Sequence, residues 1–202
     1  MKIWDVFPYW RERWAVDARL QLWAELDVDY APVALIGDRT HRGNPLPEPD
    51  LPSAVWRVSV TLDADSDWGR EAQQRDAVRV LLPHMAPDDL VLLCDADEIV
   101  DPRALPAILE ATEHGPVKLR MAHYMCGTRW RHRDPWRHAG ACRARDLPEH
   151  PSDELRMNFA IRRVADAGWH LTYFGTDEDV DLKLSAFAHA ELDIPQTRVD
   201  LA

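Results

Sequence analysis

A continuous apolar run that ends in three acids constrains the fold of this chain more than any other feature. The run lies within "DLVLLCDADE", residues 89–98, and a short apolar run of this kind predicts a strand. A strand that is apolar on both sides of its pleat is typical of the centre of a parallel sheet. Asp95, Asp97 and Glu98 follow the apolar residues directly. Because unpaired charge is costly at a buried position, these acids need a partner or a bound cation.

Segments with strand and helix patterns alternate along the rest of the chain. Short apolar or alternating runs predict strands over residues 2–7, 30–37, 55–60, 116–125 and 157–164. Apolar residues at helical spacing predict helices over residues 10–26, 67–85, 101–112 and 177–193. The last segment also alternates like a strand, but the acids at its start favour a helix. Two polar segments, residues 37–52 and 129–154, are predicted to be loops.

This alternation predicts one α/β domain over residues 1–202, with a mostly parallel central sheet and helices on both faces. The formal charge of −11 disfavours long nucleic acid and anionic membrane surfaces as partners, because both would repel the chain. The three cysteines have neither the even number of a disulfide framework nor the spacing of a metal site. No segment has the apolar length of a membrane span. We expect a soluble cytoplasmic protein.

The two aspartates after the apolar run have the spacing of a cation site, the D-x-D pattern. In open parallel sheets, ligands collect at the carboxyl ends of the strands, where Asp95 and Asp97 are expected. Two residues apart in an extended chain, their side chains start on the same side, and oxygen ligands suit Mg²⁺ or Mn²⁺. The alternative is that such acids serve as turn residues or helix caps, as we expect for Asp101.

Five separated segments resemble the motifs of one known family. They are "IWDVFPYWRE" with "DARL", "THRGNPLP", "WGREAQQRDAV", "DADEI" before Asp101 and Pro102, and "GWHLTYFGTDEDVDLKLSAFAHAE". In this order, over residues 3–191, they resemble glycosyltransferase family 17, which includes the β-1,4-mannosyl-glycoprotein N-acetylglucosaminyltransferases. The chain departs from the family's pattern at Arg11, Ile36, Gly37, Asp76 and Thr176. These departures bear on the choice of donor base and sugar.

The resemblance implies a GT-A fold, a Rossmann-like domain that uses a nucleotide-diphosphate sugar and a divalent cation. It implies inverting transfer of a sugar, by default N-acetylglucosamine, from a UDP-linked donor to a hydroxyl group of a glycan, a protein or a small molecule. The cation, Mn²⁺ or Mg²⁺, would bind the diphosphate and stabilise the charge that develops as it leaves. We therefore expect a metal-dependent glycosyltransferase.

The resemblance also implies which residues hold the cation and the donor. Asp97 would bind the cation directly, Asp95 directly or through water, and His189 would complete the coordination. His170 is the next candidate, although a structural role within the "GWH" strand is favoured for it. The residues expected to contact the donor are Asp5, Gln74, Arg75, Asp95 and Lys183. Arg75 offers a bidentate grip either on phosphate or on a carboxylate such as that of Asp95.

An inverting enzyme needs a general base near the acceptor hydroxyl group, and a carboxylate is the usual choice. Glu178 is the first candidate, because it matches the family's acid in the closing block, and Glu98 and Asp179 are the alternatives. Aromatic and basic residues expected near the sugars are Trp68 and Trp169 on the donor side and Trp130, Arg131, His132, Arg133 and Trp136 on the acceptor side. Several of the nine tryptophans must nevertheless belong to the core.

Two other functions stay open. A sugar-phosphate nucleotidyltransferase would use a similar sheet and metal-binding acids. Its usual glycine-rich N-terminal loop is absent, because the first predicted strand runs into "DVFPYW". A non-catalytic module that binds a nucleotide sugar or a glycan gains support from the departures at Arg11 and Ile36.

Overall fold

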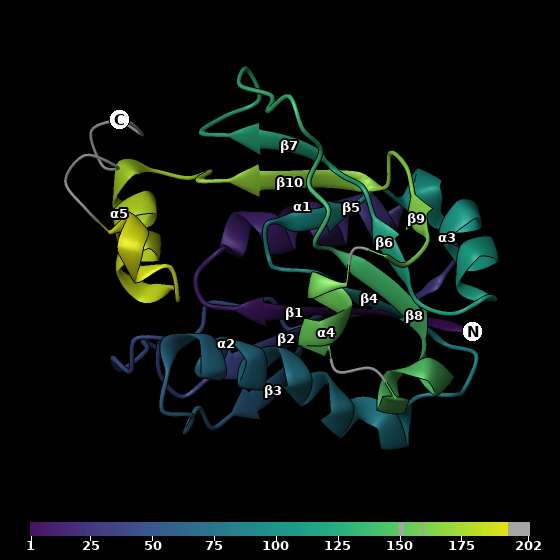
Figure 1. Ribbon diagram of the computed structural model, residues 1–202, viewed down its shortest axis with the longest axis horizontal. Coiled ribbons are helices and arrows are strands. Elements are labelled where there is room, and N and C mark those ends of the chain that lie inside the picture. The colour runs from purple at the N-terminus through teal and green to yellow at the C-terminus, as the bar shows by residue number, and fades with distance from the viewer. Residues whose placement is uncertain (150–151, 159, 194–202) are drawn as a thin grey trace.

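A seven-stranded sheet forms the centre of the protein in a computed structural model that describes residues 1–149, 152–158 and 160–193 (Figure 1). Its strands, in spatial order, are β3 (Trp56–Val60), β2 (Asp29–Gly37), β1 (Lys2–Tyr9), β4 (Leu90–Leu93), β8 (Gly140–Arg143), β6 (Val117–Leu119) and β9 (Arg163–Val164). Only β8 is antiparallel to its neighbours, so the other six strands of this sheet share one direction. The predicted α/β class and the mostly parallel sheet are confirmed.

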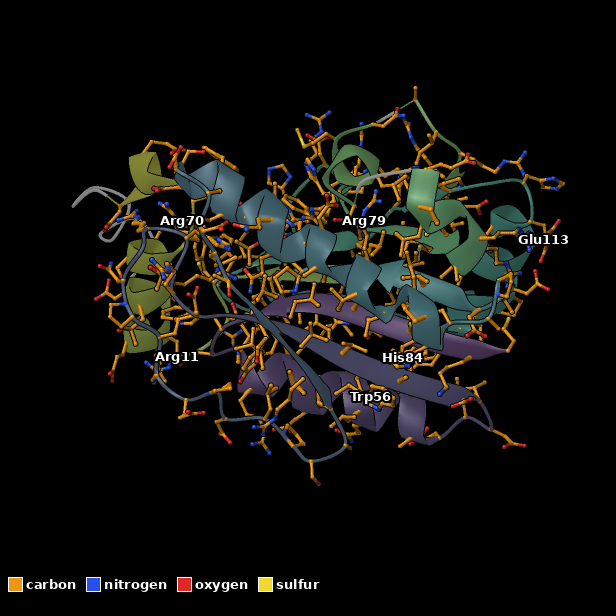
Figure 2. All side chains as sticks on the ribbon, turned by 90° about the horizontal axis from the view of Figure 1, so that it is seen from below. Arg11, Trp56, Arg70, Arg79, His84 and Glu113 are labelled. Atoms are coloured by element: carbon orange, nitrogen blue, oxygen red, sulfur yellow. The ribbon has the colours of Figure 1, made fainter. Side chains whose placement is uncertain are left out.

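Helices cover both faces of this sheet, also as predicted. The helices are α1 (Arg13–Ala24), α2 (Asp67–Asp76), α3 (Leu105–Thr112), α4 (Ser152–Met157) and α5 (Asp177–Ala186), and the 3₁₀ segments are η1 (Ala77–His84), η2 (Pro102–Ala104), η3 (Ala144–Glu149) and η4 (Ala190–Leu192). Figure 2 shows α2 and η1 crossing one face of the sheet between Arg70 and His84. Within the described ranges, no helix combines the length and the apolar character that crossing a membrane requires.

The central strand β4 is apolar on both sides because each side packs in a different core cluster. Leu90 and Leu92 belong to the cluster that contains Trp23 of α1 and Ile108 of α3. The cluster on the opposite face contains Val91 and Leu93 with residues of η1, η3 and α4. The alternation of side chains along a strand thus explains why β4 has no polar residue.

A second sheet of three strands lies beside the first, in the order β5 (Glu98–Val100), β10 (Gly168–Thr172) and β7 (Ala122–Met125). Strand β10 is parallel to β7 and antiparallel to β5. The prediction of one strand over residues 116–125 was wrong, because the chain changes sheets after β6. At the change, Arg120 bonds through its backbone to Val164 and Ala167.

The predicted loop over residues 129–154 was also wrong in its second half, which contains β8, η3 and the start of α4. The four residues of β8 are all buried between β4 and β6, yet their sequence, "GACR", has no β-branched or aromatic residue. The predicted strand over residues 157–164 is reduced to β9, and residue 159 lies outside the described part. The helix predicted in the C-terminal segment is confirmed as α5.

Candidate active site

The acids that follow β4 lie in a turn at the carboxyl edge of the central sheet. The strand ends at Leu93, residues 94–97 form the turn, and β5 begins at Glu98. The predicted location at the strand end is therefore confirmed. The assumption that Asp95 and Asp97 lie on an extended chain and face the same cation was wrong, because the turn brings each carboxylate to its own cationic side chains.

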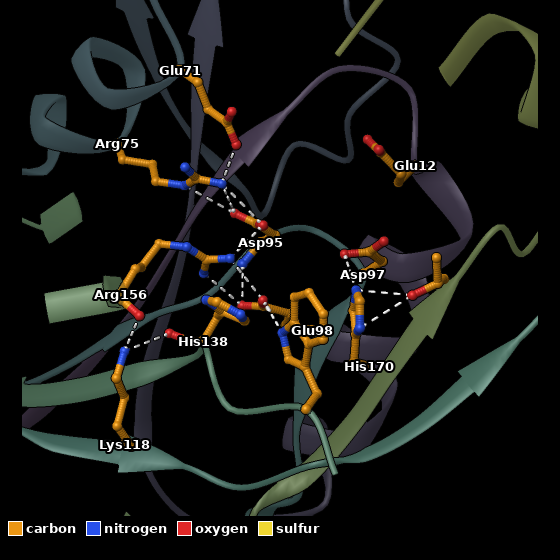
Figure 3. Close-up of polar contacts among 12 residues, drawn as sticks. Glu12, Glu71, Arg75, Asp95, Asp97, Glu98, Lys118, His138, Arg156 and His170 are labelled. Atoms are coloured by element: carbon orange, nitrogen blue, oxygen red, sulfur yellow. Dashed lines mark hydrogen bonds and ion pairs between the residues drawn. The ribbon is translucent and has the colours of Figure 1, made fainter. Parts of the chain in front are cut away.

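Asp95 lies between two arginines, one from α2 and one from α4 (Figure 3). Arg75 of α2 approaches it at 3.2 Å and Arg156 of α4 at 2.7 Å. Arg75 also forms an ion pair with Glu71. Burial by itself raises the pKa of the Asp95 carboxyl group, but the charges of Arg156 and Arg75 outweigh that effect and lower the pKa to about 2.

Glu98 is completely buried and has a structural role. Its carboxylate accepts hydrogen bonds from both guanidinium NH₂ groups of Arg156 at 2.9 Å, from the Trp136 indole at 2.5 Å and from the backbone N–H of Asp95 at 2.7 Å. A carboxylate with four donors and no exposed surface cannot receive a proton from a substrate. The alternative prediction of Glu98 as general base was wrong for this reason.

Asp97 is held by Lys183 and His170. The Lys183 ammonium group lies 2.6 Å from one Asp97 oxygen, and the Nε2 atom of His170 lies 3.5 Å from the other. Burial raises the pKa of Asp97, but Lys183 and His170 hold it well below its usual range. Lys183 also lies 3.6 Å from Glu12, in the turn between β1 and α1. This contact joins α5 to the carboxyl edge of the sheet.

These residues do not fit a divalent cation in this arrangement. No three His, Cys, Asp or Glu side chains within the described ranges are placed to hold a metal ion together. Asp95 and Asp97 already carry cationic partners on their oxygens. The predicted ligand His189 is half exposed, pairs with Glu191 and packs against the ring of Trp68. The expected dependence on Mn²⁺ or Mg²⁺ is to be decided by the effect of a chelator on turnover, and no chemical step below passes through a metal.

Two pockets open beside the acids. We call the first the sheet-edge pocket; it is lined by Val6, Pro8, Leu35, Arg75, Leu93, Cys94, Asp95, Ser152 and Arg156. We call the second the aromatic pocket; it is lined by Trp10, Arg11, Glu12, Trp14, Phe174, Asp179, Leu182 and Lys183. Within the aromatic pocket the rings of Trp14 and Phe174 are stacked, with centroids 5.8 Å apart. Lys183 lines this pocket and also bonds Asp97 in the turn after β4.

Asp5 and Gln74, which were predicted to contact the donor, are structural instead. Asp5 lies in the middle of β1 rather than at its end, is completely buried, and binds Arg19 at 2.5 Å and the Tyr30 hydroxyl group at 2.6 Å. The buried amide of Gln74 donates to the carbonyl oxygen of Leu35 at 2.7 Å. Neither side chain has a surface to offer a ligand, so both predictions were wrong.

The candidate bases of α5 differ in position. Glu178 and Asp179 are both exposed in the first turn of the helix, but only Asp179 is among the residues that line the aromatic pocket. One oxygen of Asp179 accepts hydrogen bonds from the backbone N–H and the hydroxyl group of Thr176, which caps the helix. Asp179 thus combines a helix-capping role with a place in the pocket.

His170 has the structural environment favoured for it. It is buried in β10, its ring stacks on that of Trp136 with centroids 3.9 Å apart, and its Nδ1 atom lies 3.1 Å from the Thr172 hydroxyl group. Glu12 and Arg156 were not among the sequence candidates. Glu12 stood in a quoted motif, "IWDVFPYWRE", but Arg156 lay next to a segment that gave no sign of a helix.

A comparison with known families identifies the family of this chain. An open α/β sheet with charged residues at its carboxyl edge is typical of enzymes that bind nucleotides there. The family model described as Glycosyltransferase family 17 matches residues 49–198, and the chain belongs to this family. The protein is therefore a glycosyltransferase, as expected from the resemblance.

Other comparisons add little. No curated protein matches the chain. Among solved structures, 2-C-methyl-D-erythritol 4-phosphate cytidylyltransferase of Francisella tularensis is similar with a TM-score of 0.44 and 12% identity, over 96% of this chain and 100% of that one. A likeness at this level says nothing about the activity of this chain.

Proposed function

We propose that the protein transfers a sugar, in the first instance N-acetylglucosamine, from a UDP-linked donor to an acceptor hydroxyl group with inversion. The observation that carries this proposal is the position of Lys183, which lines the aromatic pocket and also bonds Asp97 at the sheet edge. Transfer leaves a diphosphate whose charge must be stabilised. A partly buried ammonium group that lines the aromatic pocket suits that purpose.

The two pockets suit different parts of the donor and acceptor. The sheet-edge pocket has apolar walls from β1, β2 and β4, which suits the nucleotide, and its two arginines already pair with Asp95. The aromatic pocket has indole and phenyl faces beside carboxylates, which suits a sugar that needs apolar contact and hydrogen-bond acceptors together. The reacting bond would lie near Lys183, which lines the aromatic pocket and bonds Asp97.

We assign the general base to Glu12. Of the two carboxylates that line the aromatic pocket, Asp179 is tied to the helix cap, and the hydrogen bonds from Thr176 lower the pKa of Asp179. A carboxylate with a lowered pKa is a weaker proton acceptor. Within the described residues, the hydrogen bonds to Glu12, of 3.4 and 3.1 Å from the backbone of residues 10 and 11, fall on one oxygen. The other oxygen lies 3.6 Å from the Lys183 ammonium group, beyond hydrogen-bond distance, and is the one that we assign to accept a proton from a hydroxyl group.

The test is a donor screen scored by release of UDP or GDP, with acceptor sugars supplied. We expect release from UDP-N-acetylglucosamine, and a loss of roughly 100-fold or more in Glu12→Gln, the size typical of a general base. The matched control is Glu178→Gln, an exposed acid five residues before Lys183, which should keep near wild-type activity. Binding of the nucleotide sugar without turnover would instead favour a non-catalytic module, and consumption of a nucleoside triphosphate would favour a nucleotidyltransferase.

A further inference from the structure

Four arginines stand on one exposed loop of an otherwise acidic protein. The loop, which we call the arginine loop, is residues 127–137 between β7 and β8, and it contains Arg129, Arg131, Arg133 and Arg137. Its one acid is Asp134, so the loop has a charge of +3 in a chain whose net charge is −11. All four arginines are exposed, and none has a carboxylate partner among the side chains that the structure describes.

The clustering of these arginines sets them apart from others on the surface. Elsewhere on the surface, Arg39 pairs with Asp38, Arg103 with Asp101, and Arg145 with Asp88. Among the described residues, exposed arginines without a carboxylate partner also occur outside the loop, at Arg11, Arg57, Arg120 and Arg162, but there they are not gathered on one loop. A group of four without partners forms a local positive field that is suited to an anionic ligand.

The arginine loop is joined to the candidate active site. Its backbone pairs with the chain of β7 at Arg131, and the His132 N–H donates to the His123 carbonyl oxygen at 2.8 Å. The ring of His123 lies 4.8 Å from that of His170, which contacts Asp97. In Figure 1 the arrows of β1, β7 and β10 all point to the side of the molecule where α5 lies, and the loop begins at the end of β7 on that side.

We propose that the acceptor is an anionic saccharide, held through its carboxylate, sulfate or phosphate groups by the arginine loop. This inference rests on the proposed function, since it concerns the acceptor of the same reaction. Guanidinium groups bind such anions through two parallel hydrogen bonds. The indole of Trp130 is 72% exposed on the same loop and offers an apolar face for a sugar ring. The overall acidity of the chain favours a short anionic ligand over a long polyanion.

The experiment compares matched acceptors. Disaccharides that end in glucuronic acid or in glucose, with the same linkage and aglycone, are tested as acceptors by UDP release, and their binding is measured by calorimetry; sulfated and phosphorylated versions form further arms. We expect a KM at least about tenfold lower for the best anionic acceptor at low salt. The difference should shrink as NaCl is raised, because salt screens exposed charges.

A triple variant isolates the arginine loop. Substitution of Arg129, Arg131 and Arg133 by Gln should raise the KM and weaken the binding of the anionic acceptor about tenfold, with the KM for the donor unchanged. The control replaces Arg39, Arg103 and Arg145 by Gln, which removes the same charge from other segments and should have little effect.

The outcomes separate this inference from the proposed function. If the donor is turned over but anionic and neutral acceptors perform and bind alike, the anionic acceptor is wrong and the glycosyltransferase reaction stands. If no donor is turned over, the proposed reaction fails. Calorimetry then still decides whether the arginine loop binds the anionic saccharide, and equal binding by the triple variant would overturn the inference.

Discussion

The ammonium group of Lys183 lies 2.6 Å from a carboxylate oxygen of Asp97. This pair joins α5 to the turn after β4, across 86 residues of sequence. The second aspartate of the D-x-D pattern thus has a positive partner of its own, and this raises the pKa of Lys183 although burial opposes it. Because of this pair, the negative charge of Asp97 is balanced by the positive charge of Lys183.

We predict that turnover persists in the presence of a chelator, because Lys183 provides the positive charge beside Asp97. Lys183→Met, which keeps the length of the side chain but removes its charge, should lower kcat by roughly 100-fold, and Lys183→Arg should retain part of it. UDP release with EDTA measures the first effect and steady-state kinetics the second.

Calorimetric titration with Mn²⁺ supplies a readout that does not depend on activity. Wild-type protein should bind no Mn²⁺ at the site, whereas Lys183→Met, which leaves Asp97 without its ammonium partner, should bind it more tightly. Activity that disappears with EDTA and returns with Mn²⁺ would contradict the prediction and support the metal dependence implied by the family resemblance.

Arg156 should be important for stability, because it is buried and neutralises both Asp95 and Glu98. Removal of one partner leaves buried charge without compensation, which typically costs about 3–5 kcal/mol. Urea unfolding of Arg156→Met should show a loss of this size. Arg103→Met, which breaks a pair on an exposed arginine, is the control and should leave the unfolding midpoint nearly unchanged. Equal midpoints for wild type and Arg156→Met would contradict this reading of the network.

Acid should destabilise the protein partly through Asp95. Its pKa is lowered to about 2 in the folded state, compared with about 3.9 in an unfolded chain. The unfolded state therefore binds a proton first as pH falls, and the contribution of Asp95 to stability, complete above about pH 4, is lost as pH falls through about 2. Unfolding followed across this range should show a shallower pH dependence in Asp95→Asn. An unchanged slope would mean that Asp95 is not the group concerned.

The central strand and the position of the acids could be predicted from sequence because both depend on local pattern. Residues 90–94, just before Asp95, are all apolar, which is typical of a strand that is covered on both faces. Strand β8 could not be found in the same way, since "GACR" is buried by its neighbours in the sheet and carries no strand signal of its own. The turn over residues 94–97 likewise broke the predicted alternation of Asp95 and Asp97.

The sequence by itself determined the class of fold, the edge of the sheet where the acids lie, and the family to which the motifs point. Only the tertiary structure decided which charges meet: Arg156 reaches Asp95 from 61 residues away, and Lys183 reaches Asp97 from 86. It also decided that the Glu98 carboxylate is buried with four hydrogen-bond donors, whereas Glu12 lines a pocket. The physical reason is that periodicity reports what each segment buries locally, whereas the partner of a buried charge depends on where distant segments are brought by packing.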